Sequence, residues 1–339
     1  MLSQEMEKTV AELTAPSKGI LAADESSGTI EKRLKSVDVS STEEIRRGYR
    51  ELLFTAPGLG DYISGVILFE ETLQQKSAAG VPFPQLLSAQ GIVPGIKVDK
   101  GTQPLANFPG DKVTHGLQGL AERLAGYKAL GTRFAKWRAV IAIGDGLPSA
   151  RAIEVNADGL ARYAAICQEL GIVPIVEPEV LMDGNHSIER CQAVTEEVLA
   201  TVFHALHRHR VLLELMLLKP NMVLPGKDCP QQATAEEIAA ATLACFRRTV
   251  PAAMPGIHFL SGGQSDEAAT ANLNAMNSYP QAQPWQLSFS YGRALQAPAL
   301  KAWHGVAANQ AAGQQALLKR ARLNSAARQG KYTAAMETG

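Results

Sequence analysis

The sequence has no surplus charge of either sign and no long apolar run. Lysine and arginine together number 33, and so do aspartate and glutamate, which gives a net charge of zero. This balance argues against a nucleic-acid partner or an anionic membrane that binds through bulk charge. No apolar run approaches the length that spans a bilayer, and residues 1–13 mix charges of both signs where a secretory signal would be apolar. We therefore expect no nucleic-acid or membrane partner, and a cytoplasmic location.

Cysteine is also scarce. The four cysteines are far apart and form no Cys-x-x-Cys pair: Cys167, Cys191, Cys229 and Cys245. This spacing is typical of reduced thiols in a cytoplasmic protein rather than of a disulfide framework. Linkers and low-complexity segments are absent as well. We therefore expect residues 1–339 to form a single domain.

Short apolar runs alternate with helical patterns along the chain. The eight runs cover residues 19–24, 63–69, 93–99, 133–140, 173–180, 211–220, 256–263 and 286–293. Alternation of strand and helix predicts a parallel sheet, and eight units favour a closed barrel over an open sheet. The predicted fold is an α/β protein of the (β/α)8 TIM-barrel class. Residues 1–18 should add an N-terminal helix, and residues from about 297 to 339 should add helices and a short tail.

One lysine stands where a charge is costly. Lys219 closes the apolar run Val211–Leu218, which we expect to be a strand, and Pro220 follows at once. Burial disfavours the ammonium form and lowers the pKa of a lysine, and the neutral amine is a nucleophile for carbonyl carbon. For an isolated lysine, an ordinary strand-end residue that snorkels to water is the better explanation. The neighbours of Lys219 decide between the two.

Charged side chains are expected at several other strand ends. In a barrel of this class the C-terminal strand ends meet at the catalytic face. Pairs spaced i, i+2 lie on the same face of their strand. The residues concerned are Asp24, Lys97 with Asp99, Lys136 with Arg138, and Glu177 with Glu179. A single pair could be a structural ion pair, but uncompensated charges converging from many strands would each cost several kcal/mol. We therefore interpret the set as a functional site.

The basic residues of this set predict an anionic substrate. Ser261-Gly262-Gly263 precedes a helix, an arrangement that binds phosphate through backbone N–H groups and the helix dipole. Ser290, Gly292 and Arg293 follow on the next strand, where Arg293 could add a bidentate contact. Arg33 and Lys97 could form a second anion site on the opposite side. Two separated phosphates would suit a bisphosphorylated substrate.

These residues also suggest a reaction. Lys219 would attack the substrate carbonyl, and Lys136 would help to keep its amine neutral. Glu177 and Glu179 could donate and accept protons during carbinolamine formation and dehydration. The resulting iminium could stabilise the carbanion left by carbon–carbon cleavage, and Asp24 could take the hydroxyl proton. Three histidines resemble a metal site on paper but precede the sixth run, away from the catalytic face: His204, His207 and His209. We expect no metal and no other cofactor.

Seven segments together closely resemble the class I fructose-1,6-bisphosphate aldolase family, in the same order and spacing. They span most of the chain: Gly19-Ile-Leu-Ala-Ala-Asp-Glu-Ser26, Gly95-Ile-Lys-Val-Asp-Lys100, Phe134-Ala-Lys-Trp-Arg138, Ile175-Val-Glu-Pro-Glu179, Leu217-Leu-Lys-Pro-Asn-Met222, Phe259-Leu-Ser-Gly-Gly-Gln-Ser265 and Ser288-Phe-Ser-Tyr-Gly-Arg-Ala-Leu295.

The resemblance implies a metal-independent lyase of glycolysis and gluconeogenesis. Such an enzyme cleaves fructose 1,6-bisphosphate reversibly to dihydroxyacetone phosphate and glyceraldehyde 3-phosphate. Lys219 would form the Schiff base and Glu177 would be the main acid and base, supported by Asp24, Lys136 and Glu179. Ser261, Gly262 and Arg293 would hold one phosphate, and Arg33, Lys97 and Thr29 the other. The resemblance also implies a homotetramer.

Two features depart from the family pattern. Many members continue to a tyrosine on a flexible tail that assists proton exchange, whereas the last tyrosine here is Tyr332. Either another group then serves that step or the step is slower. Leu215 and Met216 are larger than the residues expected before the lysine, so neighbouring side chains must repack. Two alternative functions stay open: an aldolase for fructose 1-phosphate or sedoheptulose 1,7-bisphosphate, and a non-catalytic scaffold on the same fold.

Overall fold

A closed barrel of eight parallel strands forms the centre of the molecule and confirms the predicted fold class. The computed structural model describes residues 2–338. Around the barrel the order is β1, β2, β3, β6, β7, β8, β9, β10 and back to β1, where Ile20 pairs with Ser290. The strands are β1 (Gly19–Ala23), β2 (Ile63–Leu68), β3 (Val93–Lys97), β6 (Phe134–Ile141), β7 (Val173–Val180), β8 (Leu217–Leu218), β9 (Gly256–Phe259) and β10 (Gln286–Tyr291).

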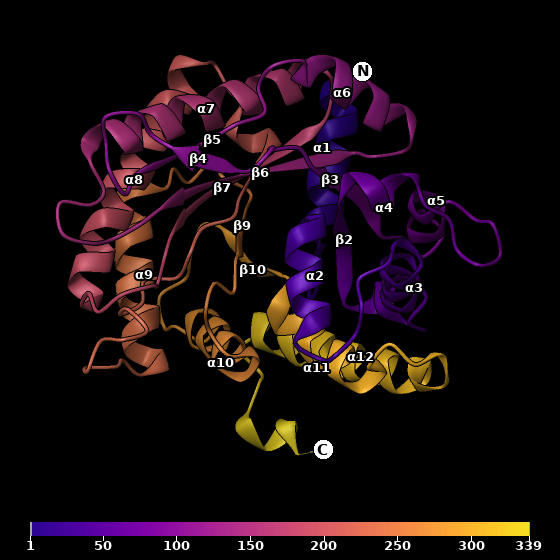
Figure 1. Ribbon diagram of the computed structural model, residues 1–339. Coiled ribbons are helices and arrows are strands. Elements are labelled where there is room, and N and C mark those ends of the chain that lie inside the picture. Colours follow the sequence, from indigo (N-terminus) through magenta and orange to yellow (C-terminus); the bar gives the residue numbers. More distant parts are fainter. Residues whose placement is uncertain (1, 339) are drawn as a thin grey trace.

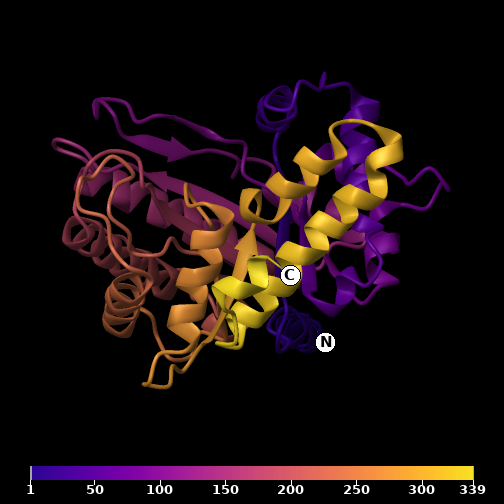
Figure 2. The same cartoon turned by 90° about the horizontal axis from the view of Figure 1, so that it is seen from below.

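Helices surround the barrel (Figure 1). They are α1 (Leu2–Leu13), α2 (Ser27–Lys35), α3 (Glu43–Phe54), α4 (Glu70–Gln74), α5 (Phe83–Ser88), α6 (Leu120–Ala129), α7 (Ala150–Glu169), α8 (Ile188–Arg208), α9 (Ala235–Thr249), α10 (Asp266–Asn277), α11 (Arg293–Trp303) and α12 (Gln310–Arg328). The long C-terminal helices α11 and α12 pack on each other, and α12 also contacts α3 and α10 (Figures 1 and 2). Among residues 2–338, no helix combines the length and apolarity needed to cross a membrane.

The sixth strand is shorter than the sequence predicts. Instead of a strand over Val211–Leu218, the structure has a 3₁₀ turn at Leu213–Leu215 and only two strand residues, Leu217–Leu218. Gln168 of α7 holds this turn by hydrogen bonds to its backbone. The hydrogen bonding between β8 and β7 continues one residue further, because the backbone N–H of Lys219 donates to a β7 carbonyl at 2.8 Å. Lys219 therefore stands at the C-terminal end of β8, as predicted.

The N-terminal end of the barrel is filled by apolar side chains. The ring of Phe134 occupies the space beside two glycines: a Cβ atom would lie 2.3 Å from the ring at Gly95 and 3.2 Å from it at Gly65. Leu215 joins this inner cluster, which also contains residues of α1, while Met216 is buried between strands and helices. Packing thus accommodates both large residues before β8. The buried polar exceptions at this end each contact a backbone carbonyl between Leu13 and Gly19, and they are Ser64, His258 and Ser288.

Candidate active site

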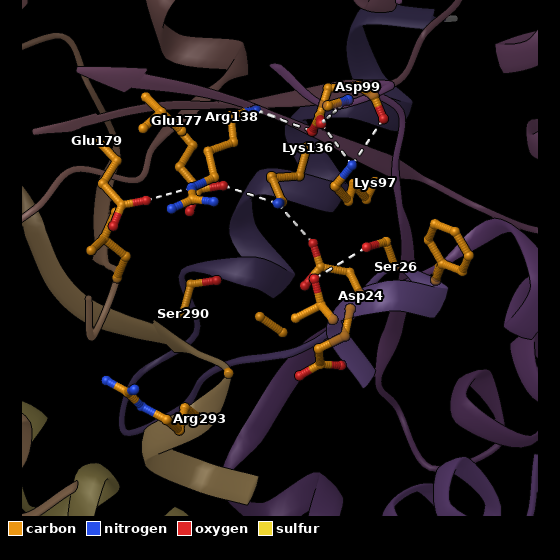
Figure 3. A pocket seen from close by; sticks show the side chains of 18 of the residues that line it. Asp24, Ser26, Lys97, Asp99, Lys136, Arg138, Glu177, Glu179, Ser290 and Arg293 are labelled. Atoms are coloured by element: carbon orange, nitrogen blue, oxygen red, sulfur yellow. Dashed lines mark hydrogen bonds and ion pairs between the residues drawn. The ribbon is translucent and has the colours of Figure 1, made fainter. Parts of the chain in front are cut away.

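The C-terminal strand ends open into one cavity of about 890 Å³ (Figure 3). Almost every site residue predicted from the sequence lines it: Asp24, Thr29, Arg33, Lys97, Lys136, Arg138, Glu177, Glu179, Lys219, Ser261, Gly262, Ser290, Gly292 and Arg293. Gly263 is the exception among the predicted residues. Its N–H donates to the sulfur of Met182 at 3.1 Å, outside the cavity.

Four side chains of alternating charge form a continuous chain at the floor of the cavity. The Nζ atom of Lys136 lies 2.7 Å from Asp24 Oδ2 and 3.0 Å from Glu177 Oε2. The other carboxylate oxygen of Glu177 lies 3.1 Å from Lys219 Nζ. The side chains are from 4 to 12 % exposed. Two strands, β6 and β7, and the residues that follow two others, β1 and β8, supply this chain, so its geometry depends on the closed barrel.

The carboxylates of this chain stay ionised despite their burial. Burial alone would raise the pKa of Asp24 and of Glu177, but Lys136 and Lys219 lower both pKa values below their ordinary range. Burial lowers the pKa of Lys136, and Asp24 and Glu177 more than offset this, so its pKa is raised. Lys136 is therefore a permanent cation at neutral pH. Glu177 lies between it and Lys219, so the charged group in contact with Lys219 is a carboxylate rather than the Lys136 ammonium.

The second carboxylate of β7 has a different partner. Glu179 forms an ion pair with Arg138 (Figure 3), and these residues lie two positions further along β7 and β6 than Glu177 and Lys136. Arg138 is 41 % exposed at its side chain and is thus available to a ligand. Within this arrangement Glu177, and not Glu179, contacts the lysine.

One side of the cavity contains groups suited to an anion. Arg293 donates to the carbonyl of Gly262 at 2.9 Å, which joins the end of β10 to the loop after β9. The hydroxyl of Ser290 is buried at the cavity wall and has no hydrogen-bond partner among the described residues. A buried hydroxyl without a partner is available to a ligand oxygen.

The opposite side is formed largely by α2. Its residues Thr29, Lys32, Arg33 and Ser36, the last at the C-cap, all line the cavity. Their spacing of i, i+3, i+4 and i+7 places them on one helix face. Lys97 completes this side and pairs with Asp99 at 2.6 Å. Lys32 and Ser36 were not predicted, although their spacing from Thr29 and Arg33 was a usable signal.

A buried network behind α2 was also missed by sequence reasoning. Glu25 accepts from Arg33, contacts Arg50 of α3 at 2.7 Å, and accepts from Gln296 of α11 at 2.8 Å. Gln296 in turn donates to the carbonyl of Ala22 at 2.7 Å. This network attaches α2 to the end of β1. No local sequence pattern reveals it, because its members are far apart in the chain.

The remaining predicted features lie away from the cavity. His204 and His207 are exposed near the end of α8, and His209 pairs with Asp158 at 3.1 Å. Within residues 2–338 no group of His, Cys, Asp and Glu is arranged to hold a metal ion. Tyr332 is also outside the cavity, because its hydroxyl contacts Glu337 at 2.9 Å.

A TIM barrel whose strand ends enclose a buried lysine–carboxylate chain between two polar, basic walls defines an enzyme for a small anionic substrate. The model of the family "Fructose-bisphosphate aldolase class-I" matches residues 5–339, and the chain belongs to this family. It is accordingly a lyase that catalyses the glycolytic aldol cleavage of fructose 1,6-bisphosphate, a phosphorylated sugar.

Relatives support this assignment along the whole chain. Fructose-bisphosphate aldolase 1 of Toxoplasma gondii is 58 % identical, with 98 % of this chain and 93 % of the relative covered. A probable class 1 aldolase of Xanthomonas campestris is 55 % identical, with 98 and 99 % covered. A Plasmodium falciparum aldolase, solved in complex with TRAP and a small-molecule inhibitor, is 51 % identical with a TM-score of 0.96, with 98 and 96 % covered.

Proposed function

We propose that the cleavage proceeds through a Schiff base on Lys219. The observation that supports this is the contact of Lys219 with Glu177, which is also held by Lys136. Glu177 takes a proton from the lysine, the amine attacks the substrate carbonyl carbon, and one amine proton passes to the former carbonyl oxygen to give the carbinolamine. The carbinolamine then loses its hydroxyl as water, protonated by Glu177, and an iminium remains. The protons balance, because Glu177 takes one proton from Lys219, gives one to the departing hydroxyl, and is a carboxylate again at the end.

Asp24 is the proposed base for carbon–carbon cleavage. It lies on the far side of Lys136 from Glu177, and its lowered pKa keeps it ionised at neutral pH. It takes the proton of the hydroxyl on the carbon that becomes the aldehyde. The electron pair of the broken bond passes to the iminium, which becomes an enamine. Glu179 supports this centre indirectly through its pairing with Arg138.

The two basic walls are the proposed phosphate sites. Ser261, Gly262, Ser290, Gly292 and Arg293 would hold one phosphate, and Thr29, Arg33 and Lys97 the other. Two sites favour a bisphosphate over fructose 1-phosphate, because a monophosphate leaves one basic wall without its anion. The kcat/KM values for fructose 1,6-bisphosphate, sedoheptulose 1,7-bisphosphate and fructose 1-phosphate test this, and equal values would contradict it.

Borohydride trapping tests the Schiff base directly. We expect fructose 1,6-bisphosphate and borohydride to leave a covalent adduct on the peptide that contains Lys219, found by peptide mass. Lys219→Ala should form no adduct and lose at least about 10³-fold in kcat, because no other group supplies the nucleophile. Lys128→Ala, at a half-buried lysine at the opposite end of the barrel, is the control and should retain both the adduct and the activity. Full activity in Lys219→Ala would overturn the proposal.

We also infer a homotetramer in the cytoplasm. Membership of the family supports the oligomeric state, and the glycolytic reaction supports the location. Light scattering of the purified protein should give four times the chain mass of 36.2 kDa. A monomer mass at micromolar concentration would contradict the first inference, and recovery in the membrane fraction would contradict the second.

A further inference from the structure

One backbone donor of the proposed phosphate loop has an unusual acceptor. Ser261 and Gly262 line the cavity, but the N–H of Gly263 donates to the sulfur of Met182 at 3.1 Å. A thioether sulfur is a weak acceptor, and backbone N–H groups normally find oxygen. The catalytic roles described above give no reason for a methionine at this contact.

Met182 is held in place independently of the loop that it contacts. It lies two residues after β7, the strand that carries Glu177 and Glu179. Its carbonyl accepts from the N–H of Lys227 at 2.7 Å, which joins it to the segment after β8. The backbone that carries this side chain is therefore held by the barrel and not by the phosphate loop.

The contact between the two segments is close. A Cβ atom added at Gly263 would lie 2.6 Å from Met182 Sδ and 3.0 Å from its Cγ. The cavity beneath the loop, between Met182, Met222 and Gln264, has a volume of only about 10 Å³, about the room for one water. Arg293 donates to the Gly262 carbonyl. The loop is thus held at two neighbouring residues by side chains from two different segments.

We propose that Met182 is a positioning residue for the phosphate site. Its sulfur binds the Gly263 N–H outside the cavity, and this contact keeps Ser261 and Gly262 at the cavity wall. The inference rests on the proposed phosphate role of those two residues. It also gives Gly263 a supporting function, in place of the phosphate contact predicted from the sequence.

Met182→Leu tests the sulfur without removing volume. We expect the KM for fructose 1,6-bisphosphate to rise about two- to threefold, less than the factor of about five for one ordinary hydrogen bond, because the sulfur is a weak acceptor. We expect kcat to change less than about twofold, because the lysine–carboxylate chain is untouched. The control is Met254→Leu, which should leave KM unchanged. Met254 lies just before β9, whereas the phosphate loop follows the other end of that strand. An unchanged KM in Met182→Leu would overturn the proposal.

Gly263→Ala tests the close approach. The added methyl group should displace Met182 and lower the melting temperature, and it should lower it less in a Met182→Ala background, where the space is free. KM should be raised in the single variant and in the double variant, because the N–H to sulfur contact is absent from both. An equal loss of stability in both backgrounds would contradict the proposal.

Arg293→Ala separates this inference from the function on which it rests. If Arg293→Ala raises KM and Met182→Leu does not, the phosphate site stands and the role of Met182 is refuted. If neither variant raises KM, the loop does not bind the substrate phosphate, and the proposed phosphate site itself is refuted.

Discussion

Glu177 is the residue on which the proposed chemistry depends most. Its two oxygens contact two different lysines, Lys136 at 3.0 Å and Lys219 at 3.1 Å. It can therefore accept a proton from Lys219 without losing its pairing with Lys136. Imine formation and its reversal both need such a group, because each passes a proton between nitrogen and a leaving oxygen.

Asp24 should make the unfolding free energy of the protein depend on pH in the acidic range. The folded-state pKa of Asp24 is below its ordinary value of 3.8, because Lys136 and Lys219 outweigh the effect of burial. A depressed pKa stabilises the folded state above the unfolded pKa of about 4, and this contribution is lost as the pH falls further. We expect the difference in unfolding free energy between wild type and Asp24→Asn to be constant from about pH 8 to 5 and to shrink below about pH 4.

Urea denaturation at a series of pH values measures this difference, and a difference that grows in acid would contradict the prediction. The same variant should form the borohydride adduct while its kcat falls about 10²- to 10⁴-fold, as expected for loss of a general base. Loss of the adduct as well would place Asp24 in imine formation instead.

At the scale of elements, a buried arginine of α3 holds Glu25, the carboxylate with which Arg33 of α2 pairs. Arg50 of α3 contacts Glu25 at 2.7 Å, and both side chains are almost fully buried, at 3 and 4 % exposed. Arg50→Met leaves the Glu25 carboxylate with one cation fewer, and removing one partner of a buried pair typically costs about 3–5 kcal/mol. We expect the unfolding free energy to fall by about 3 kcal/mol, and KM to rise because α2 carries Arg33.

Arg46 is the matched control on the same helix. It pairs with Glu71, and the two side chains are 18 and 26 % exposed. Arg46→Met should cost about 1 kcal/mol or less, since water partly compensates both charges. Thermal and urea unfolding of the two variants gives the comparison. Equal losses of unfolding free energy would show that the buried Glu25 network stabilises the fold no more than the Arg46–Glu71 pair does.

The elements differ in how well the sequence predicts them. Eight strand positions and their order follow from apolar runs separated by helical patterns, and the strand-end residues follow from the parallel barrel. The hairpin of β4 (Thr102–Pro104) and β5 (Lys112–Thr114) was not predicted, because β4 is exposed and neither strand has an apolar run. Contacts such as Glu25 with Arg50, or Gly263 with Met182, join distant segments and have no local signature. The supports of the site were therefore missed, while its charged members were found.

At the scale of the whole molecule, one arginine joins the two ends of the chain. Arg328, the last residue of α12, donates to the carbonyls of Thr14 at 2.8 Å, Ala15 at 2.5 Å, and Lys18, just before β1. Arg328→Gln should lower the unfolding free energy by about 2 kcal/mol, because these half-buried carbonyls lose a charged donor. KM should not change, since this contact is at the opposite end of the barrel from the cavity.

Urea denaturation checks the loss of stability, and Arg322→Gln, an exposed residue of the same helix, serves as control. A loss of unfolding free energy no larger than that of the control would show that the contacts of Arg328 do not stabilise the fold. A raised KM with unchanged stability would instead connect Arg328 to the cavity.

The alternating chain of Asp24, Lys136, Glu177 and Lys219 has a consequence for the electrostatics of the whole catalytic cycle. Two positive and two negative groups sum to zero. An iminium on Lys219 carries the same single positive charge as an ammonium, so the sum is unchanged. On carbon–carbon cleavage the iminium becomes a neutral enamine while Asp24 becomes a neutral acid, and the sum is zero again. In the proposed cycle the buried floor therefore never holds a net charge, and no intermediate incurs the desolvation cost of one.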